Sequence, residues 1–103
     1  MKQNLEQLAK NANEAAALLK AMSNTNRLMI LCSLLDQELS VKDLNERIPL
    51  SQSALSQHLA ALRKAELVST RRESQAIYYR IQGDSALQVI MVLKDLFCPD
   101  AED

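Results

Sequence analysis

"LSQSALSQHLAALRKAEL", residues 50–67, decides the fold, because it is the pattern of one amphipathic helix with an unusual polar side. Leu55, Leu59 and Leu62 recur at helical spacing and form the side expected to pack into a core. The opposite side carries amides and hydroxyls: Gln52, Ser53, Ser56 and Gln57. A surface helix usually carries Glu and Lys there. Amides and hydroxyls instead match the donors and acceptors that base edges present in the major groove of DNA.

The composition is that of a single globular domain. The chain has 103 residues, of which 48% are hydrophobic and 24% charged, with one Gly and two Pro, so a mainly α-helical fold is expected. No segment reaches the ~18 apolar residues that span a bilayer, and the start lacks the apolar run of a secretory signal. We therefore expect a cytoplasmic protein without a membrane partner, in which both cysteines rest as thiols.

The net charge of −1 hides a gradient along the chain. Residues 51–81 hold five basic side chains against two acidic ones, whereas residues 82–103 hold one basic against five acidic. A local basic patch indicates nucleic-acid binding better than the overall charge does. The basic segment begins with the amide-rich helix, so both features indicate the same surface.

Helical spacing and capping residues predict five helices, at residues 4–20, 25–35, 41–48, 52–66 and 85–98. Pro49 ends the third helix and Ser51 caps the fourth, which leaves a link of two or three residues, the length of a helix-turn-helix connection. Residues 67–81 favour strand and contain "ESQA" as a turn, so a two-stranded hairpin is expected. The last helix is hydrophobic all round its centre. We expect it to pack against this chain's core and, together with the first helix, against a second copy.

This order of elements is the layout of a single winged helix-turn-helix domain over residues 1–103. Its expected parts are the helix-turn-helix at 41–66, the wing at 67–81, dimerisation helices at 4–20 and 85–98, and an acidic tail at 99–103. The run "SQSALSQHLAALRKAELV" followed by "YYRI" resembles the ArsR/SmtB family of bacterial transcriptional repressors, over about residues 15–98. The cysteines in "RLMILCSLL" and "LFCP" are similar to those of the branch containing HlyU, BigR and SqrR. Glu66 is a departure, since the family usually has Gly at the end of the recognition helix.

The resemblance implies a homodimeric repressor that binds double-stranded operator DNA. The residues expected to read bases are Gln52, Ser53, Ser56 and Gln57. The residues expected nearer the DNA backbone are Ser51, His58 and Arg63. Arg71 and Arg72 in the wing suit contacts with phosphate or with the minor groove. The alternatives are a merely polar surface helix beside a hairpin, and a protein-interaction module that does not bind DNA.

Metal sensing is the weaker alternative. Ser40 and Lys42 stand where one metal site of the family has thiols, and the last helix contains no histidine for a second family site. His58 is the only histidine, and a metal site needs three or four ligands, so a structural or phosphate-facing role is favoured for it. We expect no metal and no other cofactor.

Cys32 and Cys98 are the only thiols. Without the resemblance, the ordinary interpretation is that Cys32 is a small core residue and Cys98 an incidental surface residue. The resemblance implies instead a dithiol switch, in which reactive sulfur species or oxidants join the two cysteines and the dimer releases its operator. The sequence leaves open whether the bridge is a disulfide or a polysulfide, which genes are controlled, and whether repression is direct.

No enzyme is expected. The sequence contains no nucleophile–base pairing, no phosphate-binding loop and no carboxylate pair in a supporting context. A thiol peroxidase would need an electropositive site around Cys32, whose neighbours are Leu31, Ser33 and Leu34.

Overall fold

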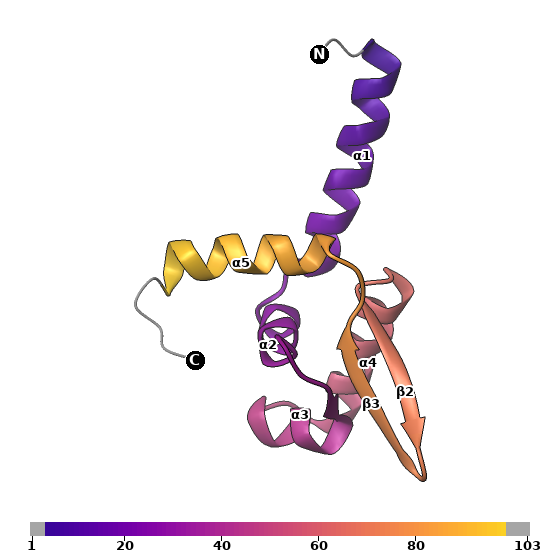
Figure 1. Ribbon diagram of the computed structural model, residues 1–103, viewed down its shortest axis with the longest axis vertical. Coiled ribbons are helices and arrows are strands. Elements are labelled where there is room, and N and C mark those ends of the chain that lie inside the picture. Colours follow the sequence, from indigo (N-terminus) through magenta and orange to yellow (C-terminus); the bar gives the residue numbers. More distant parts are fainter. Residues whose placement is uncertain (1–3, 99–103) are drawn as a thin grey trace.

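The computed structural model describes residues 4–98, which form five helices and a three-stranded antiparallel sheet (Figure 1). The elements in chain order are α1 (Leu5–Met22), α2 (Thr25–Ser33), β1 (Leu39–Ser40), α3 (Val41–Arg47), α4 (Gln52–Lys64), β2 (Val68–Glu73), β3 (Ala76–Ile81) and α5 (Ser85–Phe97). The helix α1 projects away from the other elements, and α5 crosses near its base. No helix within residues 4–98 combines the length and the apolar character that a membrane crossing needs. The predicted acidic tail lies outside the described residues.

Side-chain caps set the helix starts around the helix-turn-helix. The Ser40 hydroxyl accepts the backbone N–H of Asp43, and the Asp43 carboxylate accepts the backbone N–H of Ser40, which is a capping box at the start of α3. The predicted cap of α4 is confirmed, since the Ser51 hydroxyl accepts the N–H of Ala54 at 3.1 Å. Between the two helices, the Asn45 amide donates to the Leu50 carbonyl at 2.8 Å and braces the short turn.

The sheet contains the predicted hairpin and one strand that was not predicted. Strands β2 and β3 pair from Val68 with Ile81 to Glu73 with Ala76, which confirms the wing hairpin. The short strand β1 pairs antiparallel with the other edge of β3, with Leu39 opposite Tyr79. The predicted hairpin is therefore part of a three-stranded sheet, whose third strand, β1, was not predicted from the sequence. Two residues are too short to show a strand pattern, and only their pairing with β3 defines them.

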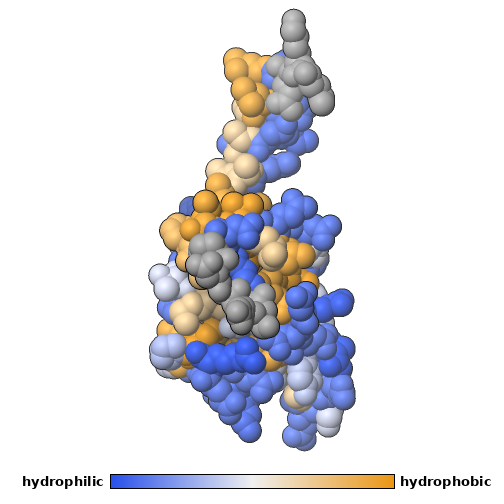
Figure 2. All heavy atoms as spheres, turned by 60° about the vertical axis from the view of Figure 1, so that its left-hand side comes forward, coloured by the Kyte–Doolittle hydropathy of each residue, from blue (hydrophilic) through white to orange (hydrophobic). Residues whose placement is uncertain are grey.

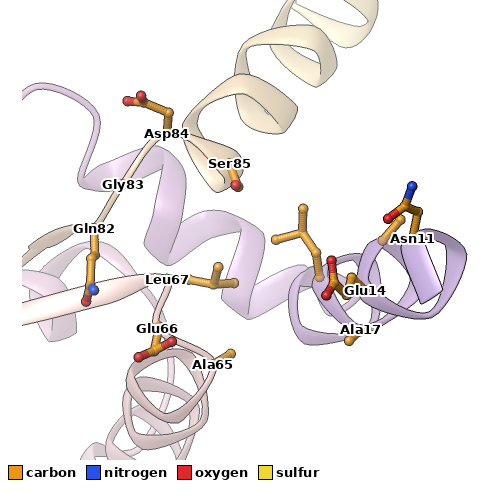
Figure 3. Close-up of a pocket in the computed structure, with 12 residues that line it drawn as sticks. Asn11, Glu14, Ala17, Ala65, Glu66, Leu67, Gln82, Gly83, Asp84 and Ser85 are labelled. Atoms are coloured by element: carbon orange, nitrogen blue, oxygen red, sulfur yellow. The ribbon is translucent and has the colours of Figure 1, made fainter. Parts of the chain in front are cut away.

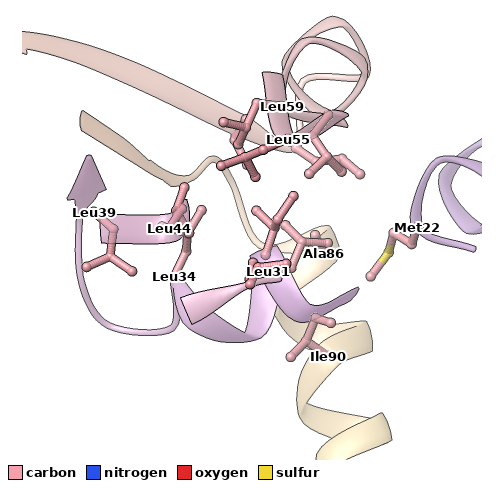
Figure 4. Close-up of a cluster of buried hydrophobic side chains, with 14 residues drawn as sticks. Met22, Leu31, Leu34, Leu39, Leu44, Leu55, Leu59, Ala86 and Ile90 are labelled. Carbon is pink, nitrogen blue, oxygen red and sulfur yellow. The ribbon is translucent and has the colours of Figure 1, made fainter. Parts of the chain in front are cut away.

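The core lies where α2, α4 and α5 meet (Figure 4). Leu55, Leu59 and Leu62 are at most 1% exposed, which confirms the predicted buried side of α4. Helix α2 contributes Ile30 and Leu31, both fully buried, and so lies centrally as expected. Burying a leucine or isoleucine side chain stabilises the fold by about 1.5–3 kcal/mol, so this packing holds α4 firmly against the body.

Large hydrophobic side chains stay exposed on α1 and on one side of α5. Leu5, Leu8 and Leu19 of α1 are 80%, 53% and 55% exposed. Figure 2 shows hydrophobic side chains along the projecting helix and around its junction with the body. In α5, Ala86 and Ile90 are buried, whereas Val92, Leu96 and Phe97 are exposed. The core contact predicted for α5 is confirmed, and its opposite side has no cover in a single chain.

Candidate nucleic-acid interface

Helix α4 presents its polar side to solvent. Because the three core leucines anchor one side, the amides and hydroxyls must point outward. The exposed residues of this surface are Ser51, Gln52, Ser53, Ser56, Gln57 and Arg63, all of them predicted site residues. Figure 1 shows α4 beside the hairpin of β2 and β3, away from the free end of α1. A helix of this kind fits the major groove of B-DNA, where its side chains reach base edges.

His58 lies on a different side of α4 from the other predicted site residues. It is half-buried, and its Nδ1 accepts a hydrogen bond from Nε of Arg27 in α2 at 3.1 Å. The structural role considered for His58 therefore has a specific partner. Its contact with the DNA backbone stays a prediction.

The wing arginine Arg71 is held by two carboxylates and a tyrosine ring. Its guanidinium pairs with Glu38 at 2.8 Å and with Glu73, and it lies 4.8 Å from the ring centre of Tyr78. The hydrogen bond from Arg71 holds the pKa of Glu38 below its ordinary value, and the two carboxylates raise the pKa of Arg71. Sequence reasoning missed Glu38 and Tyr78, because Glu38 is 33 residues away and only the fold brings it to the wing.

Arg72 is the wing cation more open to phosphate. Successive residues of a strand point to opposite faces, so Arg71 and Arg72 project from different sides of the hairpin. Arg72 is exposed, and within residues 4–98 its side chain makes no ion pair or hydrogen bond. It can therefore meet a phosphate without first giving up a carboxylate. Arg71 would have to exchange partners.

The two thiols belong to neighbouring helices. Cys32 lies in α2 and Cys98 directly follows α5, and both side chains are exposed. The interpretation of Cys32 as a core residue is therefore wrong. Partial burial raises the pKa of the Cys32 thiol, its interaction with Cys98 raises it further, and Lys94 lowers it. The packing of α2 against α5 thus places both thiols on one part of the molecule, although they are far apart in sequence.

A groove of about 830 Å³ lies between α1, the end of α4 and the start of α5 (Figure 3). Its lining includes the carboxylates of Glu14, Glu66 and Asp84. Because these groups repel phosphate, the groove does not belong to the DNA-facing surface. Among the described residues, no group of three or more His, Cys, Asp or Glu side chains is placed to hold a metal ion.

A short helix, a tight turn, an exposed recognition helix and a β-hairpin beside it define a winged helix-turn-helix, the architecture of DNA-binding transcriptional regulators. Residues 24–70 match the family model described as "Bacterial regulatory protein, arsR family". The chain is 52% identical over 95 residues to the transcriptional activator HlyU of Vibrio cholerae, which covers 92% of this chain and 88% of HlyU. The chain therefore belongs to the arsR family of DNA-binding transcriptional regulators.

Two solved structures and a further relative in sequence agree with this assignment. Reduced HlyU from Vibrio cholerae superposes with a TM-score of 0.87 at 51% identity, covering 91% of this chain and 99% of that one. The biofilm growth-associated repressor of Xylella fastidiosa is 42% identical over 93 residues, which covers 90% of this chain and 82% of the repressor. A possible ArsR-family regulator from Mycobacterium bovis, whose winged helix-turn-helix domain is described as homodimeric, has a TM-score of 0.78 at 27% identity, with 99% and 94% covered.

Proposed function

We propose that this chain is a cytoplasmic, homodimeric repressor whose operator binding is switched off by oxidation or persulfidation of Cys32 and Cys98. Reactive sulfur species or oxidants are the inducers. The observation that carries the proposal is that both thiols are exposed, one on α2 and the other directly after α5, two helices that pack against each other. Solvent can deliver the oxidant to both sulfurs, and the packing of the two helices favours resolution of the first product by the second thiol.

DNA is read by the polar side of α4 in this proposal. Gln52, Ser53, Ser56 and Gln57 contact base edges. Ser51, His58 and Arg63 contact the backbone, and Arg71 and Arg72 contact phosphate or the minor groove from the wing. Gln57→Ala removes an amide that can pair with adenine, so preference at one or two base pairs should change by ~1–3 kcal/mol. Binding of operator variants measures this change. If Gln57→Ala keeps the base preference of the parent at every position of the operator, Gln57 does not read bases.

The switch is a two-step thiol reaction. One cysteine thiolate attacks the sulfane sulfur of a low-molecular-weight persulfide, RSSH, so that a cysteine persulfide forms and the thiol RSH leaves. The second thiolate then attacks the cysteine-bound sulfur, closes a disulfide and expels HS⁻. The two electrons given up by the thiols reduce the sulfane sulfur to sulfide. A polysulfide bridge keeps extra sulfur atoms and consumes further equivalents of the same donor.

The bridge changes DNA binding through the dimer. It ties α2 to α5, and α5 carries the exposed hydrophobic residues that a second copy would cover. Two recognition helices must lie ~34 Å apart to enter successive major grooves. A shift of α5 against α2 alters this spacing, so the reduced dimer binds and the bridged dimer releases. We expect the bridge to lower operator affinity by ~5–150-fold, which is the usual size of the coupling between two linked sites.

Single-cysteine variants test the switch. Cys32→Ser and Cys98→Ser should each bind the operator when reduced, because neither residue lies on α4 or the wing. Neither variant can form an intramolecular bridge. Both should therefore stay bound to the operator after treatment with a persulfide donor that makes the parent protein dissociate from it. Mass spectrometry of the treated parent should find peptides containing residues 32 and 98 joined, and the added mass distinguishes a disulfide from a polysulfide.

The same experiment separates the alternatives. If the persulfide donor makes Cys98→Ser dissociate fully from the operator, the two-thiol bridge is contradicted. Release of the untreated parent by zinc or cadmium, without a response to sulfur, would indicate a metal-responsive repressor. A parent that binds no duplex DNA in its reduced form would indicate a protein-interaction module.

A further inference from the structure

Arg27 connects three helices at the edge of the core. It extends from the first turn of α2, and its Nε donates to Nδ1 of His58 on α4 at 3.1 Å. Its Nη1 donates to the carbonyl oxygen of Ala21, in the last turn of α1, at 3.2 Å. Both hydrogen bonds are partly buried. One guanidinium therefore holds the recognition helix and the projecting helix at the same time.

The hydrogen bonds of Arg27 depend on the relative orientation of the helices, whereas the packing of the hydrophobic core depends on it less. Apolar packing is non-directional, so it tolerates small rotations of one helix against another. A hydrogen bond weakens steeply as its angle departs from linear. Within residues 4–98, the bond between Arg27 and His58 is the side-chain hydrogen bond that joins α4 to either α1 or α2. This hydrogen bond therefore adds an orientation-dependent contact to the packing that holds α4.

The contact also requires one tautomer of the imidazole. An arginine only donates hydrogen bonds, so the contact needs Nδ1 of His58 as its acceptor, which is the tautomer with the proton on Nε2. Because His58 is the only histidine, this tautomer gives the protein a single, readable spectroscopic signature.

We infer that Arg27 is a positioning residue for DNA binding, which fixes α4 relative to α1 through His58 and so sets the placement of the two recognition helices in a dimer. The inference uses the dimer and the DNA surface of the proposed function, but not its thiol switch. Arg27 is half-buried, and the proposed DNA surface is the polar side of α4 and the wing, of which Arg27 is not a part. Its loss should therefore matter most where two half-sites must be matched at once.

The test compares a two-half-site operator with a duplex that carries one half-site. Arg27→Gln should bind the operator about tenfold more weakly than the parent at one salt concentration, whereas binding to the single half-site should change little. Lys20→Gln is the matched control. It also removes one positive charge, and it does so in the last turn of α1, which contains the Ala21 carbonyl that Arg27 binds. This control should lose equally little affinity for both duplexes.

A second variant at Arg27 keeps the test decisive if Arg27→Gln folds poorly. Arg27→Lys keeps the positive charge but has a single nitrogen, which cannot reach both His58 Nδ1 and the Ala21 carbonyl as the guanidinium does. It should therefore show the same operator-selective loss. ¹⁵N spectra of the parent should show an unprotonated Nδ1 and a protonated Nε2, and Arg27→Gln should shift the ring towards a mixture of tautomers.

Three results would overturn the inference. The first is equal binding of Arg27→Gln and the parent to the operator. The second is an equal loss on both duplexes, which would indicate a general charge effect. The third is a parent spectrum with the proton on Nδ1. A parent that binds neither duplex would instead contradict the DNA surface of the proposed function.

Discussion

Glu66 occupies a backbone position that favours glycine. Its φ is 63°, in the left-handed region, and the N–H groups of Glu66 and Leu67 donate to the carbonyls of Arg63 and Leu62, each at 2.9 Å. This crossed pair is a Schellman motif, which ends α4 and turns the chain into the wing. The recognition helix thus ends with the geometry that a glycine gives, although Glu pays a steric cost for it.

Glu66→Gly should stabilise the folded protein. Relieving the left-handed strain contributes about 1–2 kcal/mol, and the greater freedom of glycine in the unfolded chain offsets about 0.5–1 kcal/mol of it. A net gain of roughly 0.5–1 kcal/mol should raise the Tm by a few degrees at fixed protein concentration. Glu66→Ala removes the same carboxylate but keeps Cβ, so its Tm should not rise. A gain of equal size in both variants would indicate a charge effect.

The reactivity of Cys32 should depend on pH in a defined direction. Burial raises the pKa of this thiol above its ordinary value of 9.0, so its thiolate fraction at neutral pH is small. The alkylation rate of Cys32 in the Cys98→Ser variant should therefore still be rising at pH 9. Lys94 lowers the pKa, so adding Lys94→Gln should move the rate profile to higher pH. A plateau below pH 8 would contradict the direction of the shift.

At the scale of elements, the wing is tied to the body by the Arg71–Glu38 pair. The pKa of Glu38 is lowered in the folded state, so the pair is fully present above the unfolded pKa of a glutamate. It is lost only as the pH falls through the depressed folded value. At neutral pH both groups are charged, and DNA phosphate must compete with Glu38 for the guanidinium.

Glu38→Gln should strengthen DNA binding in a sequence-independent way. It removes a negative charge next to the wing and releases Arg71 from one of its two carboxylates, while Glu73 remains. The affinity should therefore rise several-fold and the salt dependence should steepen by up to about one ion. Titrations of two unrelated duplexes at several salt concentrations measure both effects. Glu14→Gln on α1 removes the same charge far from the wing and serves as the control. If Glu38→Gln instead binds both duplexes more weakly than the parent, the Arg71–Glu38 pair orders Arg71 for DNA binding.

At the scale of the whole molecule, the exposed hydrophobic residues of α1 need a cover. Residues 5, 8, 12, 15 and 19 alternate in steps of three and four, the spacing of a helix that pairs with another helix. Leu5, Leu8 and Leu19 within this series are more than half exposed in the single chain. A second copy of the chain is the simplest partner for this side.

Sedimentation at micromolar concentration should give about twice the 11.5 kDa mass of one chain. Leu8→Glu places a charge in the middle of the exposed series and should shift the equilibrium towards monomer, with a large loss of operator affinity because two linked half-sites are no longer engaged together. Asn13→Glu adds the same charge to α1 outside this series and should remain dimeric. Monomeric parent protein under these conditions would remove the basis of the two-half-site model.

Features encoded by short-range signals could be predicted from the order of residues alone. The leucines of residues 50–67 identified the buried side of α4, because helical spacing places them on one side whatever they pack against. Ser51 and Pro49 located the turn, because capping and the restriction before proline act within a few residues. The exposed polar side of α4 followed as its complement.

Only the tertiary structure decided the contacts that join distant residues. Strand β1 has two residues and exists through its pairing with β3. Arg27 meets His58 across 31 residues, and Arg71 meets Glu38 across 33. The effect of Cys98 on the pKa of Cys32 likewise requires α2 and α5 to be packed together. No local pattern encodes such pairs, because they depend on how the helices dock around a non-directional hydrophobic core.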